Sequence, residues 1–316
     1  MNFIAQAFKG KIKWYHYFIT AILVFIIIQI GILPLLLTAF IKTGSAYNFQ
    51  EAAATTFMNI GINTNLYLAL MLIPFVFGLA GLFLCLKTIH NLNIKYIITA
   101  RKHVDWQRIF YAFGLWFVIA VFFLIIDYFV YPTHYEFNFK PIPFALLVLV
   151  SVLLIPLQTS FEEIFFRGYL MQAFGVLTKK RIVALVITSV VFGLLHGSNP
   201  EVAQLGKIIL VYYVATGFLF GIITLMDEGI ELSIGLHAAN NIAAALFVTT
   251  NWTVFQTDAL FFDNSEPQLN WMMFIPLFVV YPILLWWFSK KYDWKNWKQK
   301  LLGSVERPTK IIQDLN

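Results

Sequence analysis

Residues 144–171 decide the fold, and they read FALLVLVSVLLIPLQTSFEEIFFRGYLM. A helix crosses a bilayer with about 20 mainly apolar residues, and this stretch exceeds that length. Its second half nevertheless contains Glu162, Glu163 and Arg167 within two helical turns. Each charged residue at the centre of a membrane helix costs about 2.5–3.5 kcal/mol. Three of them in one span therefore indicate pairing, function or both.

The rest of the chain has the same apolar character. Of its 316 residues, 60% are hydrophobic and only 12% are charged, which is too apolar for a soluble domain. The net charge of +6 is typical of basic loops beside a membrane, so we predict no nucleic-acid partner. The single cysteine, Cys85, makes no intrachain disulfide. We predict an all-α, polytopic membrane protein with about eight transmembrane helices, at residues 14–41, 66–88, 109–131, 144–171, 182–197, 206–226, 232–248 and 271–288.

Lysine and arginine gather in loops that alternate along the chain. They precede the first span and follow the second, fourth and eighth spans, whereas the loops between are acidic or sparse in charge. Because basic loops favour the cytoplasm, we predict a multi-pass cell-membrane protein with both termini cytoplasmic. The loop with Asp227, Glu228 and Glu231 should be cytoplasmic too, although it is acidic. The basic residues are Lys9, Lys11, Lys13, Lys95, Arg101, Lys102, Arg108, Lys179, Lys180, Arg181, Lys290, Lys291, Lys295, Lys298 and Lys300.

The chain divides into three regions. Residues 1–143 form N-terminal transmembrane helices and loops, residues 144–250 form a candidate catalytic core, and residues 251–316 hold an outer loop, the last span and a basic cytoplasmic tail. Within the core, two glycine pairs have the spacing that lets membrane helices pack closely. They are Gly193 with Gly197, and Gly217 with Gly221.

Helix phase separates the two adjacent glutamates. Glu163 lies four residues before Arg167, which is the favourable orientation for a salt bridge along a helix. Glu162 is rotated by about 100° from Glu163 and cannot share that face. We therefore expect Glu163 to have a structural role and Glu162 to be available for catalysis. A charge cluster at the interfacial end of a helix is the alternative interpretation.

Two later apolar helices also carry polar, proton-active groups. His196 lies in the stretch FGLLHG at 192–197, and His237 and Asn241 share one helical face in HAANN at 237–241. Each segment alone is also typical of a core histidine or of a polar pair between helices. Together with Glu162, they indicate a site for an activated water inside the membrane.

Two chemistries fit these residues. Glu162, His196 and His237 have the composition of a catalytic zinc site with an open fourth position, so Zn²⁺ is a candidate cofactor. Alternatively, Glu162 and His196 act together as a general base without a metal, and His237 and Asn241 donate hydrogen bonds to the oxyanion. The histidine-glutamate-x-x-histidine motif of common zinc proteases is absent from the sequence.

The three motifs in this order resemble the CAAX protease and bacteriocin-processing family, also called the type II CAAX prenyl endopeptidase or lysostaphin-resistance-protein-A-like family. They are Glu-Glu-x-x-x-Arg at 162–167, Phe-x-x-x-His at 192–196 and His-x-x-x-Asn at 237–241, and the resemblance covers about residues 144–248. It implies an eight-helix intramembrane endopeptidase whose cavity opens to the cytosol. Its substrate would be a membrane protein or lipidated peptide in the lipid bilayer, either prenylated or leader-containing.

The resemblance also implies residue roles. Glu162 and His196 would activate the water, with support from Glu163 and Arg167. Phe192 would pack beside the site, and His237 with Asn241 would form the oxyanion hole or complete a metal site. Some members of the family are linked to bacteriocin immunity or to scaffolding without proteolysis, so a non-catalytic membrane protein is the alternative function.

The depths of these residues do not match at first sight. Glu162 should lie roughly 15 Å from the cytoplasmic end of its span, at about 1.5 Å per residue. His237 should lie about six residues from that same side. His196 should lie near the outer end of a short fifth span. For the three to meet, the helices must tilt or the fifth must begin deeper.

Overall fold

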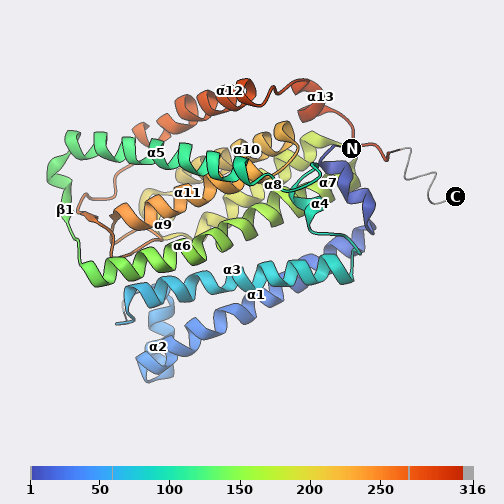
Figure 1. Cartoon of the computed structure of the whole chain (residues 1–316). Helices are drawn as coiled ribbons and strands as arrows, with labels where there is room; N and C mark the ends of the chain where they lie inside the picture. The colour runs from blue at the N-terminus through green and yellow to red at the C-terminus, as the bar shows by residue number, and fades with distance from the viewer. Residues whose placement is uncertain (1, 59, 270, 309–316) are drawn as a thin grey trace.

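The computed structural model describes residues 2–58, 60–269 and 271–308, so the end of the predicted tail, 309–316, lies outside the described residues. It is an elongated bundle of long helices that run roughly side by side (Figure 1). The α-helices are α1 (Trp14–Thr43), α2 (Ala46–Ala53), α3 (Thr64–Thr88), α4 (Lys95–Ile98), α5 (Trp106–Val130), α6 (Pro141–Glu163), α7 (Met171–Thr178), α8 (Arg181–Leu195), α9 (Pro200–Leu205), α10 (Leu210–Asp227), α11 (Glu231–Phe247), α12 (Tyr281–Lys291) and α13 (Trp297–Leu302).

Shorter elements complete the bundle. The π-helical segments are η3 (Ile164–Leu170) and η7 (Pro276–Val280). The 3₁₀ segments are η1 (Ile4–Lys9), η2 (Pro132–His134), η4 (His196–Ser198), η5 (Lys207–Ile209) and η6 (Trp271–Phe274). A small sheet has the order β1 (Tyr135–Phe137), β3 (Phe261–Asp263) and β2 (Val248–Thr249), with β3 antiparallel to β1 and parallel to β2.

The all-α, polytopic membrane architecture is confirmed. Six helical stretches of the described chain are long and apolar enough to cross a membrane. The predicted spans at 232–248 and 271–288 correspond to α11, with 17 residues, and to η7 followed by α12, so the total of eight stays a prediction. The fourth span is longer than we predicted, because α6, η3 and α7 form one helical stretch, Pro141–Thr178.

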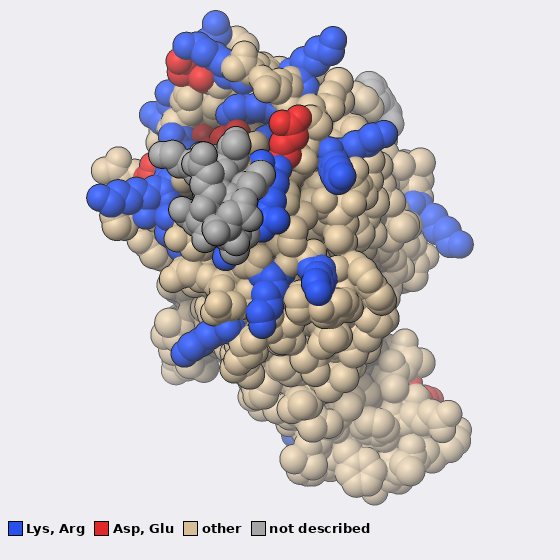
Figure 2. Space-filling model, turned by 90° about the vertical axis from the view of Figure 1, so that its right-hand side faces the viewer, with Lys and Arg blue, Asp and Glu red and all other residues tan. Residues whose placement is uncertain are grey.

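One end of the bundle gathers the loops that were predicted to be cytoplasmic. We call it the basic end, and Figure 1 shows it at the right, with the N-terminus and α13. Backbone hydrogen bonds join its segments, from the Ala100 N–H to the Glu228 carbonyl and from the Val305 N–H to the Lys179 carbonyl. Lysine and arginine side chains are spread across this face (Figure 2). The basic end comprises residues 2–13, 88–108, 178–181, 227–231 and 292–308.

The remaining loops meet at the opposite end, which we call the strand end because it holds β1, β2 and β3. The Thr64 hydroxyl donates to Asp258 at 2.9 Å, and the Val254 N–H donates to Glu201 at 3.1 Å. These bonds tie together loops that are distant in the sequence. The strand end comprises the described residues of 44–63, 131–140, 197–207 and 248–269.

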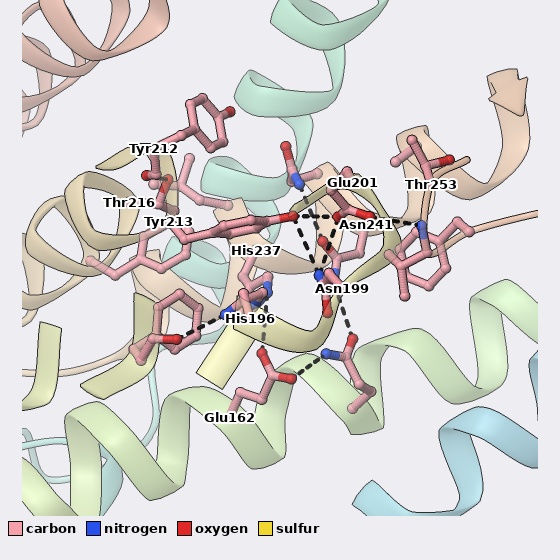
Figure 3. Close-up of a pocket in the computed structure, with 18 of the residues that line it drawn as sticks. Glu162, His196, Asn199, Glu201, Tyr212, Tyr213, Thr216, His237, Asn241 and Thr253 are labelled. Carbon is pink, nitrogen blue, oxygen red and sulfur yellow. Dashed lines mark hydrogen bonds and ion pairs between the residues drawn. The ribbon is translucent and has the colours of Figure 1, made fainter. Parts of the chain in front are cut away.

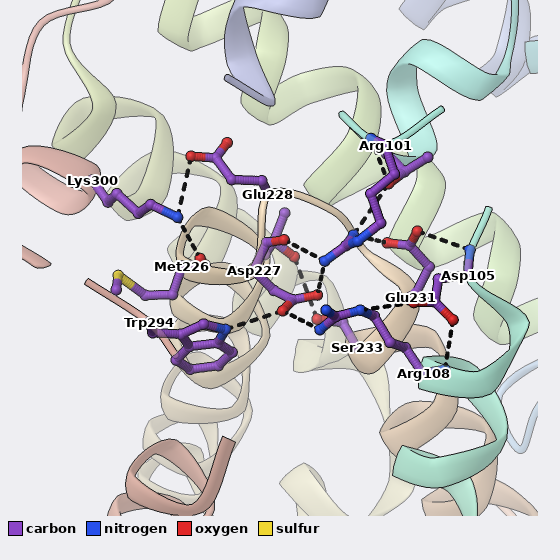
Figure 4. Close-up of polar contacts among 12 residues, drawn as sticks. Arg101, Asp105, Arg108, Met226, Asp227, Glu228, Glu231, Ser233, Trp294 and Lys300 are labelled. Atoms are coloured by element: carbon purple, nitrogen blue, oxygen red, sulfur yellow. Dashed lines mark hydrogen bonds and ion pairs between the residues drawn. The ribbon is translucent and has the colours of Figure 1, made fainter. Parts of the chain in front are cut away.

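At the basic end, the acidic loop 227–231 pairs with Arg101 from the loop before α5 and with Arg108 from the first turn of α5 (Figure 4). Asp227 is 2.6 Å from both Arg101 and Arg108, and Arg101 is also 3.1 Å from Glu231. Both acidic side chains are almost completely buried. This pairing explains how acidic residues share an end with the basic loops.

Glycines allow α8 and α10 to pack closely. A Cβ on Gly217 would lie 2.6 Å from the Ser189 carbonyl oxygen, and one on Gly193 would lie 2.7 Å from the Val214 backbone nitrogen. Gly221 is packed against Leu185, whereas a Cβ on Gly197 would meet no atom within 4 Å. The predicted close packing therefore holds for Gly193, Gly217 and Gly221 and is wrong for Gly197, which lies beyond the end of α8.

We expect Gly217→Ala to lower the free energy of unfolding by about 1–3 kcal/mol, the range for overpacking of a close contact. Gly114→Ala in α5 is the matched control, because its Cβ would meet no atom within 4 Å. Thermal unfolding of both variants in detergent measures the difference. Equal melting temperatures for the two variants would contradict this account of the α8–α10 contact.

Candidate active site

A cavity of about 510 Å³ lies among α3, α6, α8, α10 and α11, with part of its wall formed by strand-end loops. Four of the predicted site residues line it: Glu162, His196, His237 and Asn241 (Figure 3). Glu163 and Arg167 do not line the cavity, and both side chains are completely buried behind it. The structure thus separates the adjacent glutamates as helix phase predicts.

The helix that carries the glutamates changes form at the site. Glu162 and Glu163 end α6, and the next residues, Ile164–Leu170, form the π-helical segment η3. The rings of Phe161 and Phe165 stack at an interplanar angle of 17° across this junction. Single π-helical turns are common at functional sites, where they redirect side chains.

The predicted salt bridge between Glu163 and Arg167 is present. Arg167 Nη1 donates to Glu163 Oε1 at 3.0 Å. The guanidinium also lies 4.0 Å from the centre of the Phe192 ring and 5.3 Å from that of Phe220, within range of cation–π attraction. Phe192 therefore packs beside the site, as the resemblance implies, and it does so on the arginine.

His237 connects the two glutamates. Its Nδ1 is 2.8 Å from Glu163 Oε1 and its Nε2 is 3.5 Å from Glu162 Oε2. Because an ionised carboxylate only accepts hydrogen bonds, Nδ1 carries the proton that is donated to Glu163. This leaves Nε2 directed toward the catalytic candidate Glu162. The sequence pointed to His237 as a site residue but not to its pairing with Glu163.

Gln158 is a site residue that the sequence reasoning missed. Its side-chain amide donates to Glu162 Oε1 at 2.7 Å, and its carbonyl accepts from Asn241 Nδ2 at 3.1 Å. It lies four residues before Glu162 on the same face of α6, and this spacing could have identified it. The amide thereby links the carboxylate on α6 to the asparagine on α11.

His196, the residue after α8, is held by other partners. Its Nδ1 donates to the Phe192 carbonyl at 2.8 Å, so the neutral ring presents Nε2 as an acceptor. The ring stacks on Tyr213 with centroids 4.3 Å apart, and the Tyr213 hydroxyl donates to the buried Glu201. Asn199 also donates to Glu201, at 3.1 Å. No sequence signal separated these three supporting residues from ordinary loop residues.

The longer fourth helix explains how Glu162 and His196 come to similar depths in the bundle. Because the helix that holds Glu162 continues to Thr178, Glu162 lies near the middle of the bundle and not close to its basic end. Residue 178 is sixteen positions further on, or roughly 24 Å at about 1.5 Å per residue. His196 directly follows the end of α8. The cavity is lined by both Glu162 and His196.

The trio proposed for zinc does not fit a three-ligand site in this arrangement. Among the described residues, no three His, Cys, Asp or Glu side chains are placed to hold a metal ion. Glu162 and His237 lie 3.5 Å apart. Both histidines are fixed through Nδ1, His237 by Glu163 and His196 by the Phe192 carbonyl, so both Nε2 atoms stay available, and only the placement of the three side chains speaks against a shared metal ion.

Comparison with known proteins agrees with the motifs. Residues 141–243 match the family model described as type II CAAX prenyl endopeptidase Rce1-like, and this segment holds every motif residue. The chain is also 28% identical, over 298 residues, to the uncharacterized protein YyaK of Bacillus subtilis strain 168. That alignment covers 92% of this chain and 97% of YyaK. No solved structure matches the chain.

We expect Glu163→Ala to destabilise the fold by about 3–5 kcal/mol, the cost of leaving a buried charge without its partner. Glu162→Ala, at the adjacent position, should change stability much less, because Glu162 faces the cavity. Thermal unfolding in detergent compares the two. A Glu163→Gln, Arg167→Met double variant should recover part of the loss. Equal destabilisation by Glu162→Ala would show that the two glutamates do not have separate roles.

Proposed function

We propose that the chain is an intramembrane endopeptidase, on the premise that residues 141–243 match the model of the type II CAAX prenyl endopeptidase Rce1-like family. The observation that carries the proposal is the Glu162 carboxylate, which faces a cavity inside the helix bundle beside His237. The substrate is a membrane-associated peptide, since much of the cavity wall is apolar, including Leu72, Phe75 and Leu219.

Glu162 is the general base in this proposal. Its carboxylate takes a proton from a water in the cavity, and the resulting hydroxide attacks the carbonyl carbon of the scissile peptide bond. His196, which also lines the cavity, orients this water through Nε2, a hydrogen-bond acceptor. When the carbon–nitrogen bond breaks, protonated Glu162 returns the proton to the leaving amine. Atoms and charge balance without a covalent enzyme intermediate.

His237 and Asn241 stabilise the oxyanion that forms on the attacked carbonyl. Asn241 uses one N–H of its amide on Gln158, which leaves the second N–H for the substrate. Glu163 holds the Nδ1 side of His237, and the imidazole donates to the oxyanion through Nε2. Donors fixed in place before the reaction are the most effective in an environment of low polarity.

Loss of cleavage in Glu162→Gln tests the base. We expect turnover of a membrane-associated peptide to fall by about 10²–10⁴-fold, the usual contribution of a general base. His196→Ala should also reduce turnover, whereas Asn48→Ala in the distant helix α2 serves as a control with an exposed side chain. Rates are measured in proteoliposomes. Wild-type turnover in Glu162→Gln would remove this residue from the mechanism and favour the scaffold or immunity function.

Metal removal tests whether peptide hydrolysis proceeds without a bound metal ion. We expect purified protein to retain turnover in the presence of a strong chelator, because the three candidate ligands do not converge. Metal analysis of the same sample by mass spectrometry provides the second readout. Stoichiometric zinc, together with loss of turnover on chelation and recovery on zinc addition, would contradict this prediction.

A further inference from the structure

The cavity extends from Glu162 toward the strand end of the molecule. Its wall includes Asn199 and Glu201 from the loop after α8, and Thr250 and Thr253 from the loop after α11. Figure 3 shows Asn199, Glu201 and Thr253 around the part of the cavity away from Glu162. None of the residues that line it comes from the described part of the basic end.

Buried side chains close the cavity toward the basic end. Glu163 and Arg167 fill the space next to Glu162, and Met171, Ile223 and Leu232 follow on α7, α10 and α11. All five have 0% of their surface exposed. The protein interior is closely packed here, so a peptide has no path from the basic end to Glu162 through these side chains.

The strand-end loops are attached to the site itself. Glu201 accepts from the Tyr213 hydroxyl and from the Val254 N–H, and Tyr213 stacks on His196. A continuous set of contacts therefore joins the loop after α11 to a catalytic candidate. This arrangement makes the strand-end loops part of the wall that a substrate contacts.

Charge distinguishes the two ends of the bundle. Apart from Arg167 in the core, the described lysines and arginines lie at or beside the basic end, except for Lys42, Lys140 and Lys207 at the strand end. A bias of this size places the basic end in the cytoplasm. The strand end then faces the outside of the cell membrane.

We infer that the cavity receives its substrate from the extracytoplasmic side of the membrane. The inference rests on the proposed peptidase function and specifies its substrate class. A leader-containing peptide that is secreted, or anchored with its cleavage site outside, reaches Glu162 from the strand end. A prenylated chain end in the cytosol approaches the closed end. This direction is opposite to the cytosolic opening that the family resemblance implies.

Cysteine labelling in cells that express the full chain tests the direction of access without any substrate. The native Cys85 is buried and is replaced by serine to give a background without thiols. Ala244→Cys places a thiol on an exposed position of the cavity wall, and Thr253→Cys places one nearer the strand end. Lys298→Cys, exposed on α13, is the matched control at the basic end. A charged maleimide that does not cross membranes is the probe.

We expect Ala244→Cys and Thr253→Cys to be labelled in intact cells to the same extent as after permeabilisation. Lys298→Cys should be labelled only after permeabilisation. The reverse pattern overturns the inference, and so does labelling of the cavity positions only after permeabilisation or only in detergent. Because labelling requires no turnover, an inactive protein with the expected pattern would count against the peptidase function alone.

Discussion

The site depends on the two contacts that the Glu163 carboxylate makes, with Arg167 and with His237. This carboxylate lies completely buried between the Arg167 guanidinium at 3.0 Å and the His237 ring at 2.8 Å. A buried charge is tolerated in an apolar bundle only when it is paired and hydrogen-bonded. Arg167 supplies the opposite charge, and its own guanidinium packs on Phe192. Helices α6, α8 and α11 are thereby held together by a small group of charges around one carboxylate.

This arrangement releases the neighbouring carboxylate for chemistry. Glu162 follows the helix round to the cavity, where Gln158 and His237 are its partners. Glu163 therefore binds the His237 imidazole at Nδ1, while Glu162 faces Nε2 of the same ring. Two adjacent residues of the same type acquire different surroundings because the helix turns by about 100° between them.

The distribution of charge over the surface distinguishes the two ends of the bundle. Lysines and arginines concentrate at one end, and the acidic loop there is bound to Arg101 and Arg108. These pairs satisfy buried acids and hold the loop before α5 against the start of α11. The cavity extends from the bundle centre toward the other end, so the cavity and most of the basic side chains lie on opposite sides of the bundle centre.

The sequence by itself determined the all-α membrane fold, because apolar blocks of sufficient length must form helices in a bilayer. It also determined the Glu163–Arg167 pair, because contacts within a helix follow from residue spacing. Only the tertiary structure decided that His237 binds Glu163, that Gln158 bridges to Asn241, and that Tyr213 and Glu201 support His196. These partners lie on different helices, or in a loop far from the motif, and spacing along one helix carries no information about which helices meet. The sequence also did not predict that the helix continues from α6 through η3 to Thr178. A polar residue such as Gln172 marks the end of a span that faces lipid, but it is tolerated inside a helix where neighbouring helices bury it.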